Sequence, residues 1–231
     1  MVWSTQGSRP ASETLRLFAS RVAARGAHVL GRRVDAHDLA RLVVPDTVAA
    51  RHADDLARRA CGRTLLNHCV RTYIWAALIG IGEQRAFDAE ALYVAALLHD
   101  IGLVPKYDTG RCFETDGAHV ARELLHSVGW KPERAELVAG AIRDHWSGPE
   151  SQDEVESVLL AQGAAIDVVG RRVPAFDEET IEQVVDVVPR AGFKREFLRL
   201  LQLQERKPRC HVRDALEAGF AGLVLAAPYD E

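Results

Sequence analysis

The chain has few of the features that mark several classes of protein. Its 231 residues include only 4 cysteines, without a Cys-x-x-Cys pair, and no apolar run reaches the roughly 20 residues that cross a bilayer. The first residues lack the apolar stretch of a signal peptide. Lysine and arginine (29) do not outnumber aspartate and glutamate (33), so a net charge of -4 attracts no polyanion. We therefore expect a cytoplasmic protein with neither a membrane nor a nucleic-acid partner.

Composition and periodicity predict one all-α domain. Apolar residues make up 48% and charged residues 27%, which is ordinary for a globular protein. Apolar positions recur with the 3.6-residue period of a helix, and no long stretch alternates as a strand would. The helices expected in the core span residues 46–62, 64–81, 89–101, 116–128, 132–146 and 153–170.

The two ends of the chain are expected to extend this core, which we place at about 64–170. Residues 1–12 are predicted to be flexible, and a helix with Leu15, Phe18 and Val22 on one face follows them. Residues 171–231 are predicted to form three more helices, the last over 212–226. This extension carries no pattern with a chemical meaning. Capping the bundle and pairing two subunits into a homodimer are both open for it.

Local signals define the ends of two core helices. Asp88 is predicted to cap the helix that starts at residue 89, and Gly102 stops that helix. Asp153 and Glu156 have the spacing of a capping box for the last core helix. Between the two lies a polar loop of about ten residues after Gly102, and loops of that kind often line a site.

Helical geometry separates four of the nine histidines by the face on which they lie. At 100° per residue, His145 lies on the centre line of an apolar stripe, His99 continues another, and His68 borders a third. These three side chains are expected to point into the core. His119 lies opposite the apolar stripe of its helix, so we expect it to face solvent.

Two carboxylates interrupt the most apolar helices. Asp100 follows His99 directly, and Asp167 lies within an uncharged segment. A buried ionised carboxylate costs several kcal/mol unless a cation or strong hydrogen bonds compensate it. For Asp167 alone, Arg71 of another helix could do so. Three inward histidines and two carboxylates together favour a divalent ion, with zinc, iron, nickel or manganese suited to these donors, whereas unclustered thiolates argue against a structural cysteine-zinc site.

Short motifs give the chain a resemblance to a known family. The pair His99-Asp100, with His68 upstream and Asp167 downstream, resembles the HD superfamily of metal-dependent hydrolases. The resemblance implies a bundle of about five helices that binds a divalent ion through His68, His99, Asp100 and Asp167. The stretches 67–73, 99–102 and 113–118 look most like the cyanamide hydratase branch, in which a zinc-bound water is thought to add across a carbon–nitrogen triple bond.

Other HD proteins hold a second metal through two further histidines that lie between the His-Asp pair and the last aspartate of the motif. In this chain, His119 and His145 lie in that part of the sequence. Only His145 has the right orientation, so one metal is the expectation; Asp116 could replace His119. His145 and Asp100 are the candidates for moving protons. On the loop side, Glu114 and Asp116 could orient the amino groups of a substrate, whereas Lys106 and Arg111 could hold an anion.

The sequence therefore favours a metal-dependent hydrolase or hydratase that acts on a small nitrile-like or amide-like molecule. Zinc is the preferred ion, with iron or manganese as alternatives. A phosphohydrolase or phosphodiesterase needs several basic groups near the ion, and the candidates are few: Lys106, Arg111 and Arg71. A di-iron oxygenase would need His119 in the core. A non-catalytic helical module, with the last helix as its contact surface, is the remaining alternative.

Overall fold

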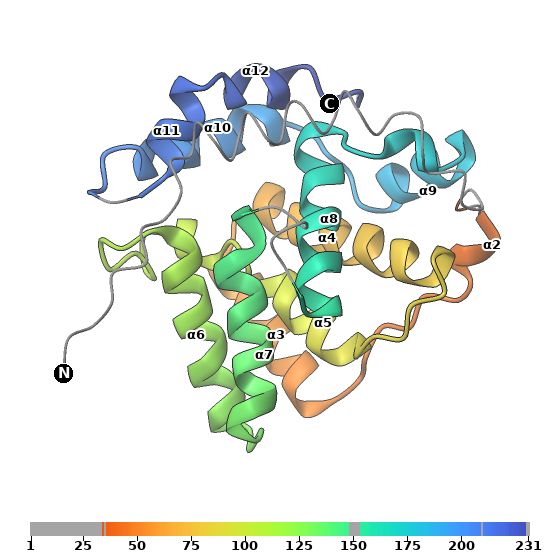
Figure 1. Cartoon of the computed structure of the whole chain (residues 1–231), viewed down its shortest axis with the longest axis horizontal. Helices are drawn as coiled ribbons and strands as arrows, with labels where there is room; N and C mark the ends of the chain where they lie inside the picture. Colours follow the sequence, from red (N-terminus) through yellow and green to blue (C-terminus); the bar gives the residue numbers. More distant parts are fainter. Residues whose placement is uncertain (1–33, 35, 148–152, 209, 230–231) are drawn as a thin grey trace.

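The structure is a computed structural model that describes residues 34, 36–147, 153–208 and 210–229 (Figure 1). Within these ranges every regular element is helical, and the β contact found is one isolated bridge between Val34 and Phe176. The prediction of an all-α protein is thus confirmed. The predicted flexible segment 1–12 and the helix carrying Leu15, Phe18 and Val22 lie outside the described residues.

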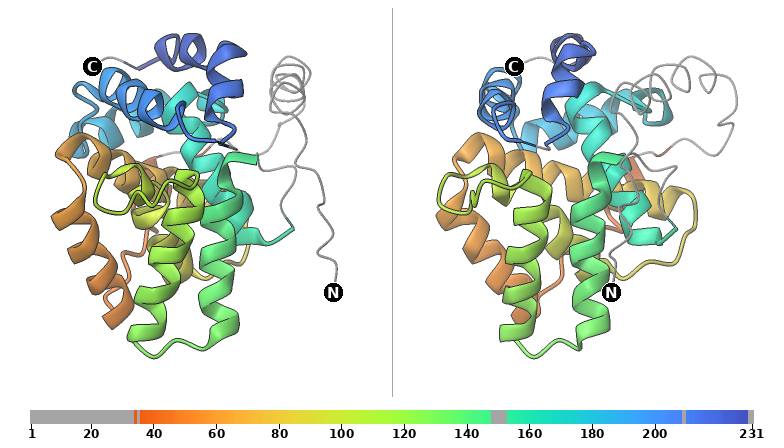
Figure 2. Two further views of the ribbon diagram at one scale, coloured as in Figure 1. Left: turned by 90° about the vertical axis from the view of Figure 1, so that its left-hand side faces the viewer. Right: turned by 60° about the vertical axis from the view of Figure 1, so that its left-hand side comes forward.

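Six helices form the bundle that carries the site. They are α3 (Val48–Ala60), α4 (Arg63–Gly82), α5 (Ala89–Leu98), α6 (Phe113–Ser127), α7 (Pro132–Asp144) and α8 (Val155–Val169). Helices α6 and α7 run side by side as a hairpin (Figures 1 and 2). Helix α8 crosses α4 so closely that a Cβ at Gly163 would lie 2.4 Å from the carbonyl oxygen of Thr72. Only glycine allows this approach, which brings the polar residues of the two helices together.

Helix ends follow the sequence signals at some positions and depart from them at others. Asp88 caps α5 as predicted, with its side chain accepting a hydrogen bond from Ala91 N (3.0 Å). However, α5 ends at Leu98, and the next regular element is the short 3-10 helix η1 (Ile101–Leu103). The predicted capping box of α8 is wrong, because Glu154 is its N-cap and Glu156 binds Asp88 N at 2.7 Å instead.

The last part of the chain forms α9 (Glu178–Val187), α10 (Phe193–Gln204), α11 (Val212–Glu217) and α12 (Phe220–Leu225). The single helix predicted over 212–226 is wrong, because Gly219 adopts a φ of 93° and divides it into α11 and α12. These elements cover one end of the bundle (Figure 2). Short elements elsewhere are α2 (Ala36–Leu39), η2 (His145–Ser147) and η4 (Val173–Ala175).

A second apolar cluster joins this extension to the bundle. Phe193, Phe197 and Leu201 of α10 are buried against Leu65 of α4 and Phe113 of α6. The extension therefore caps the bundle, which was one of the two roles left open. The predicted homodimer through these helices stays a prediction. Among the described residues, no helix has the length and apolarity that a membrane span requires.

A disulfide bond links Cys112, the N-cap of α6, to Cys210, which immediately precedes the His211 N-cap of α11. The two residues are 98 positions apart, so sequence spacing did not indicate that they meet. The expectation of unclustered thiols is therefore wrong for this pair. Structural disulfides are rare in cytosolic proteins, and the predicted compartment stays a prediction.

Candidate metal centre

Three donor atoms from two segments of the bundle converge on one buried point. His68 lies on α4, whereas His99 and Asp100 occupy the turn between α5 and η1. Nε2 of His68 lies 3.2 Å from Nε2 of His99, and each of these nitrogens is 3.4 Å from Oδ2 of Asp100. All three residues are at most 2% exposed. The predicted inward orientation of both histidines is confirmed.

The remaining ring nitrogens fix which nitrogen of each histidine faces this point. Nδ1 of His99 lies 2.8 Å from the carbonyl oxygen of Ala96, and Nδ1 of His68 lies 2.7 Å from a carboxylate oxygen of Asp167. Both partners accept hydrogen bonds, so each Nδ1 carries a proton. In the neutral rings, both Nε2 atoms then direct unshared electron pairs toward each other and toward the Asp100 carboxylate.

This arrangement fits a divalent cation. Two nitrogen lone pairs and a carboxylate oxygen repel one another without a positive charge between them, and Oδ2 of Asp100 has no hydrogen-bond partner among the described residues. Four ligands at about 2.0 to 2.1 Å from zinc are separated by about 3.4 Å in a tetrahedron. The observed separations of 3.2 to 3.4 Å match that spacing. The three side chains therefore form a candidate metal site.

The protonation states of the site point the same way. Burial lowers the pKa of His99 to about 3, which keeps this ring neutral and able to bind a metal. Burial opposes ionisation of Asp100, but His99 and His68 outweigh it and lower its pKa to about 2. Burial also opposes the charged form of His68, but its interactions with the carboxylates of Asp100 and Asp167 outweigh it and raise its pKa. The negative charges of Asp100 and Asp167 thus favour a positive charge at His68, and a divalent cation beside Nε2 would supply one.

Asp167 lies behind His68, on the Nδ1 side of the ring. Arg71 contacts its carboxylate with two nitrogens at 2.8 and 2.9 Å, and Arg190 reaches it at 2.9 Å. Burial raises the pKa of Asp167, but Arg71, the His68 hydrogen bond and Arg190 outweigh it and hold the pKa well below its usual value. The pairing of Asp167 with Arg71, which the sequence offered as an alternative to a metal ion, is therefore confirmed. Its predicted place among the metal ligands stays a prediction.

The C-terminal extension contributes residues that no sequence signal marked. Arg190 completes the cluster around Asp167, and the ring of Phe193 stacks on His68 with centroids 4.8 Å apart. Phe197 covers the same imidazole at 5.7 Å. An arginine and two phenylalanines in an amphipathic segment are ordinary in any helical protein, so only the fold reveals that they close the site.

His145 borders the three donor atoms, as its position on the apolar stripe predicts. Its Nε2 lies 3.9 Å from Oδ1 of Asp100, and its ring meets that of His99 edge-on at 5.0 Å. Nδ1 of His145 donates to the carbonyl oxygen of Ile142. Nε2 of the neutral ring is consequently free to accept a proton on the side of the site.

The other predicted site residues lie elsewhere. Lys106 is exposed, with its amine 5.3 Å from the centre of the Tyr107 ring, and His119 is exposed on α6 as expected. The carboxylate of Asp116 is occupied by the loop, since it accepts hydrogen bonds from Thr109 and Arg111. Glu114 is buried beside His211. The structure therefore does not assemble the second metal site that His119 or Asp116 would have formed with His145.

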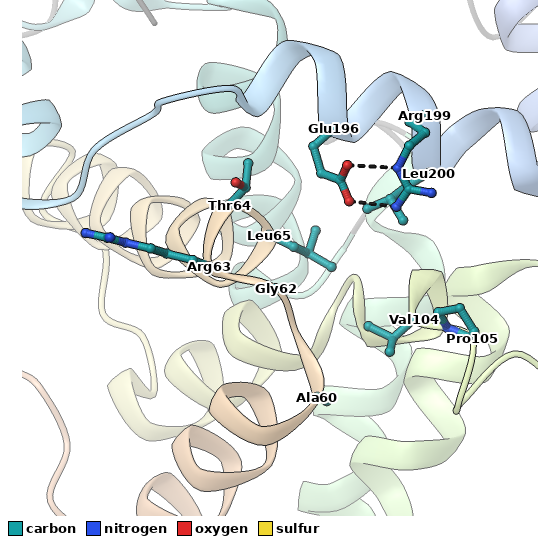
Figure 3. Close-up of a pocket in the computed structure, with 10 residues that line it drawn as sticks. All are labelled: Ala60, Gly62, Arg63, Thr64, Leu65, Val104, Pro105, Glu196, Arg199 and Leu200. Carbon is teal, nitrogen blue, oxygen red and sulfur yellow. Dashed lines mark hydrogen bonds and ion pairs between the residues drawn. The ribbon is translucent and has the colours of Figure 1, made fainter.

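A cavity of about 220 Å³ opens between α10, the start of α4 and the loop after η1 (Figure 3). It is lined by Ala60, Gly62, Arg63, Thr64, Leu65, Val104, Pro105, Glu196, Arg199 and Leu200. Leu65 lies one helical turn before His68, and Leu200 lies one turn after Phe197. Its walls thus come from the same segments that carry and cover the candidate metal centre.

An all-α bundle with a buried cluster of two histidines and an aspartate is typical of a class of metal-binding proteins. Comparison with known sequences identifies the family. The family model described as "HD domain" matches residues 65–180, half of the chain, so the chain belongs to the HD domain family. It is similar to the cyanamide hydratases DDI2 and DDI3 of Saccharomyces cerevisiae, each 28% identical over 174 residues, which cover 72% of this chain and 77% of theirs.

A second similarity is to an uncharacterised protein of Clostridium beijerinckii, 31% identical over 88 residues. That alignment covers 38% of this chain and 55% of the Clostridium protein, so it spans about half the length of that relative. The family and the yeast enzymes together support a metal-dependent hydrolase of the HD type.

Proposed function

We propose that the protein is a metal-dependent hydratase or hydrolase that adds water to a small, uncharged nitrile-like or cyanamide-like molecule. The observation that carries this proposal is the convergence of His68 Nε2, His99 Nε2 and Asp100 Oδ2 within 3.2 to 3.4 Å of one another. These residues would hold the ion, with zinc preferred over iron or manganese for a set rich in imidazole. Bound there, the ion supplies Lewis acidity, which lowers the pKa of a coordinated water.

The chain's own residues prepare the site for that chemistry. Asp167 holds His68 through Nδ1, as acceptors commonly orient metal-binding histidines, and the carbonyl oxygen of Ala96 does the same for His99. His145 accepts a proton at Nε2, the nitrogen that faces Asp100, and returns it to the nitrogen of the substrate. Phe193 and Phe197 exclude bulk water from the His68 side.

The charges around the site favour a neutral substrate over a phosphate ester. Three basic residues were candidates for binding phosphate, and each is directed elsewhere. Arg71 pairs with Asp167, Arg111 pairs with Asp116, and Lys106 lies exposed beside Tyr107. A phosphoryl transition state needs convergent positive charge, so these placements disfavour the phosphohydrolase alternative. The cavity beside Leu65, at about 220 Å³, suits a small molecule and is proposed as its entrance.

A substrate comparison tests the proposal. Purified protein, loaded with zinc, is supplied with cyanamide, with simple nitriles and with an aryl phosphate, and product formation is followed for each. The proposal expects urea from cyanamide and at most trace cleavage of the phosphate, with both lost in the His99→Ala variant. Efficient phosphate cleavage without any reaction of cyanamide or nitriles would overturn it.

A further inference from the structure

A second group of metal-ligand side chains lies where the C-terminal extension meets the bundle. Ligand atoms of Cys112, Glu114 and His211 all lie within 4.8 Å of one another, and Cys210 is bonded to Cys112. Cys112 and Glu114 come from the start of α6, whereas Cys210 and His211 come from the segment that leads into α11. Four potential ligands thus meet from two segments about a hundred residues apart in the chain.

The polar atoms of this cluster are incompletely satisfied. Glu114 is 3% exposed, and its Oε2 has no hydrogen-bond partner among the described residues. Its Oε1 lies 2.8 Å from Nε2 of His211, but that nitrogen also lacks a hydrogen bond of acceptable geometry. A buried carboxylate with an unpartnered oxygen is costly. These two atoms without hydrogen bonds, in a cluster that also contains the sulfur of Cys112, indicate a place for a cation.

We infer that this cluster binds Zn²⁺ when its disulfide is reduced, with Cys112, Cys210, His211 and Glu114 as the four ligands. Zinc prefers four-coordinate sites made of thiolate, imidazole and carboxylate. The Cα atoms of the two cysteines are 5.0 Å apart, so both sulfurs can reach one ion after side-chain rotation. The cluster is separate from the His68, His99 and Asp100 site and shares no residue with it.

The redox step balances with a dithiol as the reductant. Two electrons and two protons pass from the dithiol, which becomes a disulfide, to the Cys112–Cys210 bond, which becomes two thiols. Each thiol releases its proton to solvent when it binds Zn²⁺, and the charge of zinc does not change. In reverse, an oxidising disulfide reforms the bond between the two cysteines and expels the ion.

The disulfide of the oxidised chain and the zinc ion of the reduced chain would both connect the start of α6 to the segment that leads into α11. Lys207, three residues before Cys210, donates to the carbonyl oxygen of Arg111 and pairs with Asp108, so the extension already contacts the loop after η1. Trp146 links this junction to His145 beside the candidate metal centre, with its ring centre 5.7 Å from that of His211 and 6.5 Å from that of His145. The zinc ion would therefore keep the extension attached under reducing conditions, in which the disulfide is lost.

Metal content and spectroscopy of the full chain test the inference. Protein is either reduced with a non-chelating phosphine or left oxidised, supplied with Zn²⁺, passed through a desalting column and analysed for zinc and free thiols. The reduced chain is expected to hold one more zinc ion than the oxidised chain. With Co²⁺ in place of zinc, the reduced chain alone is expected to show a thiolate-to-cobalt charge-transfer band, which nitrogen and oxygen ligands do not give.

Matched variants separate this site from other sources of metal. Cys210→Ser is expected to lose the extra ion and the band, whereas Cys61→Ser, which changes a free buried cysteine, is expected to keep both. Glu114→Gln, a conservative change that keeps both cysteines, is expected to weaken the binding of the additional zinc ion to the reduced chain. In His99→Ala the extra ion should remain. Equal zinc in the reduced and oxidised wild type, or a cobalt band that persists in Cys210→Ser, would overturn the inference.

Discussion

The two sides of the His68 ring differ in how far their polar groups are satisfied. On the Nδ1 side, both oxygens of Asp167 are engaged by Arg71, Arg190, the Trp75 indole and His68 itself. On the Nε2 side, a second imidazole and a carboxylate crowd together, and Oδ2 of Asp100 has no hydrogen bond among the described residues. The His68 ring thus separates the hydrogen-bonded network around Asp167 from the group around Asp100, in which polar atoms lack hydrogen bonds.

The difference shows how a fold supports a reactive site. Buried charges are stable when their hydrogen bonds are complete, so the Asp167 side fixes the orientation of His68 and joins α4, α8 and the extension. The Nε2 side leaves its atoms unpaired, which is the state expected when their partner is the divalent ion proposed above. We therefore expect substitutions on the Nε2 side to remove metal and activity, and those on the Nδ1 side to lower stability.

The largest effect is expected for Asp100→Asn. This change removes the negative oxygen that completes the donor set, so activity should fall by about 10³-fold through loss of the ion. The free energy of unfolding of the metal-free protein should fall by less than in the Arg71 variant described next, because Oδ2 forms no hydrogen bond among the described residues and only the attraction between its charge and the two histidines is lost. Enzyme assays check the predicted loss of activity, and denaturant unfolding checks the predicted stability. A variant with the wild-type rate but a large loss of stability would contradict the assignment of the Nε2 side to metal binding.

On the other side of the ring, Arg71→Met is expected to lower the free energy of unfolding by about 3 to 5 kcal/mol, the usual cost of breaking a buried ion pair. Because Arg71 helps to hold the pKa of Asp167 low, its contribution is complete at neutral pH. It should shrink as the pH falls below about 4, where the unfolded carboxyl becomes protonated. A loss equally large at pH 3 and pH 7 would contradict this account.

A smaller effect is expected for His145→Gln, which keeps a polar side chain beside the donor atoms but removes the proton acceptor. The turnover number should fall by about 10²-fold, the lower range for loss of a general acid or base. Metal content should stay at the wild-type level, and one limb of the pH-rate profile should disappear. If the profile of the variant matched that of the wild type, His145 would have no part in proton transfer.

The smallest effect is expected for a substitution in the cavity beside Leu65, which we propose as the entrance for the substrate. Thr64→Trp would fill the cavity from its rim without altering either side of His68, and should lower kcat/KM by about 10-fold while leaving metal content and stability unchanged. Leu203→Trp is the control, since Leu203 is an exposed position on α10 outside the cavity lining. Equal activity in the two variants would show that substrate enters elsewhere.

Local sequence patterns were sufficient for the parts of the molecule in which neighbours in sequence determine the outcome. The inward faces of His68, His99 and His145, the outward face of His119 and the Asp88 cap all follow from helical periodicity and capping chemistry. These features depend on residues within one or two turns. The pair His99-Asp100 could be recognised because both residues share one turn of the chain.

Apart from the Arg71–Asp167 pair, which the sequence offered as one alternative, contacts between distant segments could not be predicted in this way. Arg190 joins Asp167 across 23 residues, Cys112 joins Cys210 across 98, and neither pair has a distinctive spacing. Similarly, no sequence pattern around His211 indicates that it approaches Glu114. Such contacts arise from the way in which the extension packs on the bundle, which depends on the shapes of both surfaces.

The central claim is that His68, His99 and Asp100 hold one divalent ion. The most direct test measures metal per chain by elemental analysis after dialysis, on oxidised protein, in which the cysteine cluster is closed, for the wild type and His99→Ala. Circular dichroism verifies that both are folded. The account predicts about one ion per wild-type chain and nearly none in the variant. A folded His99→Ala protein that retains the full metal content of the wild type would contradict it.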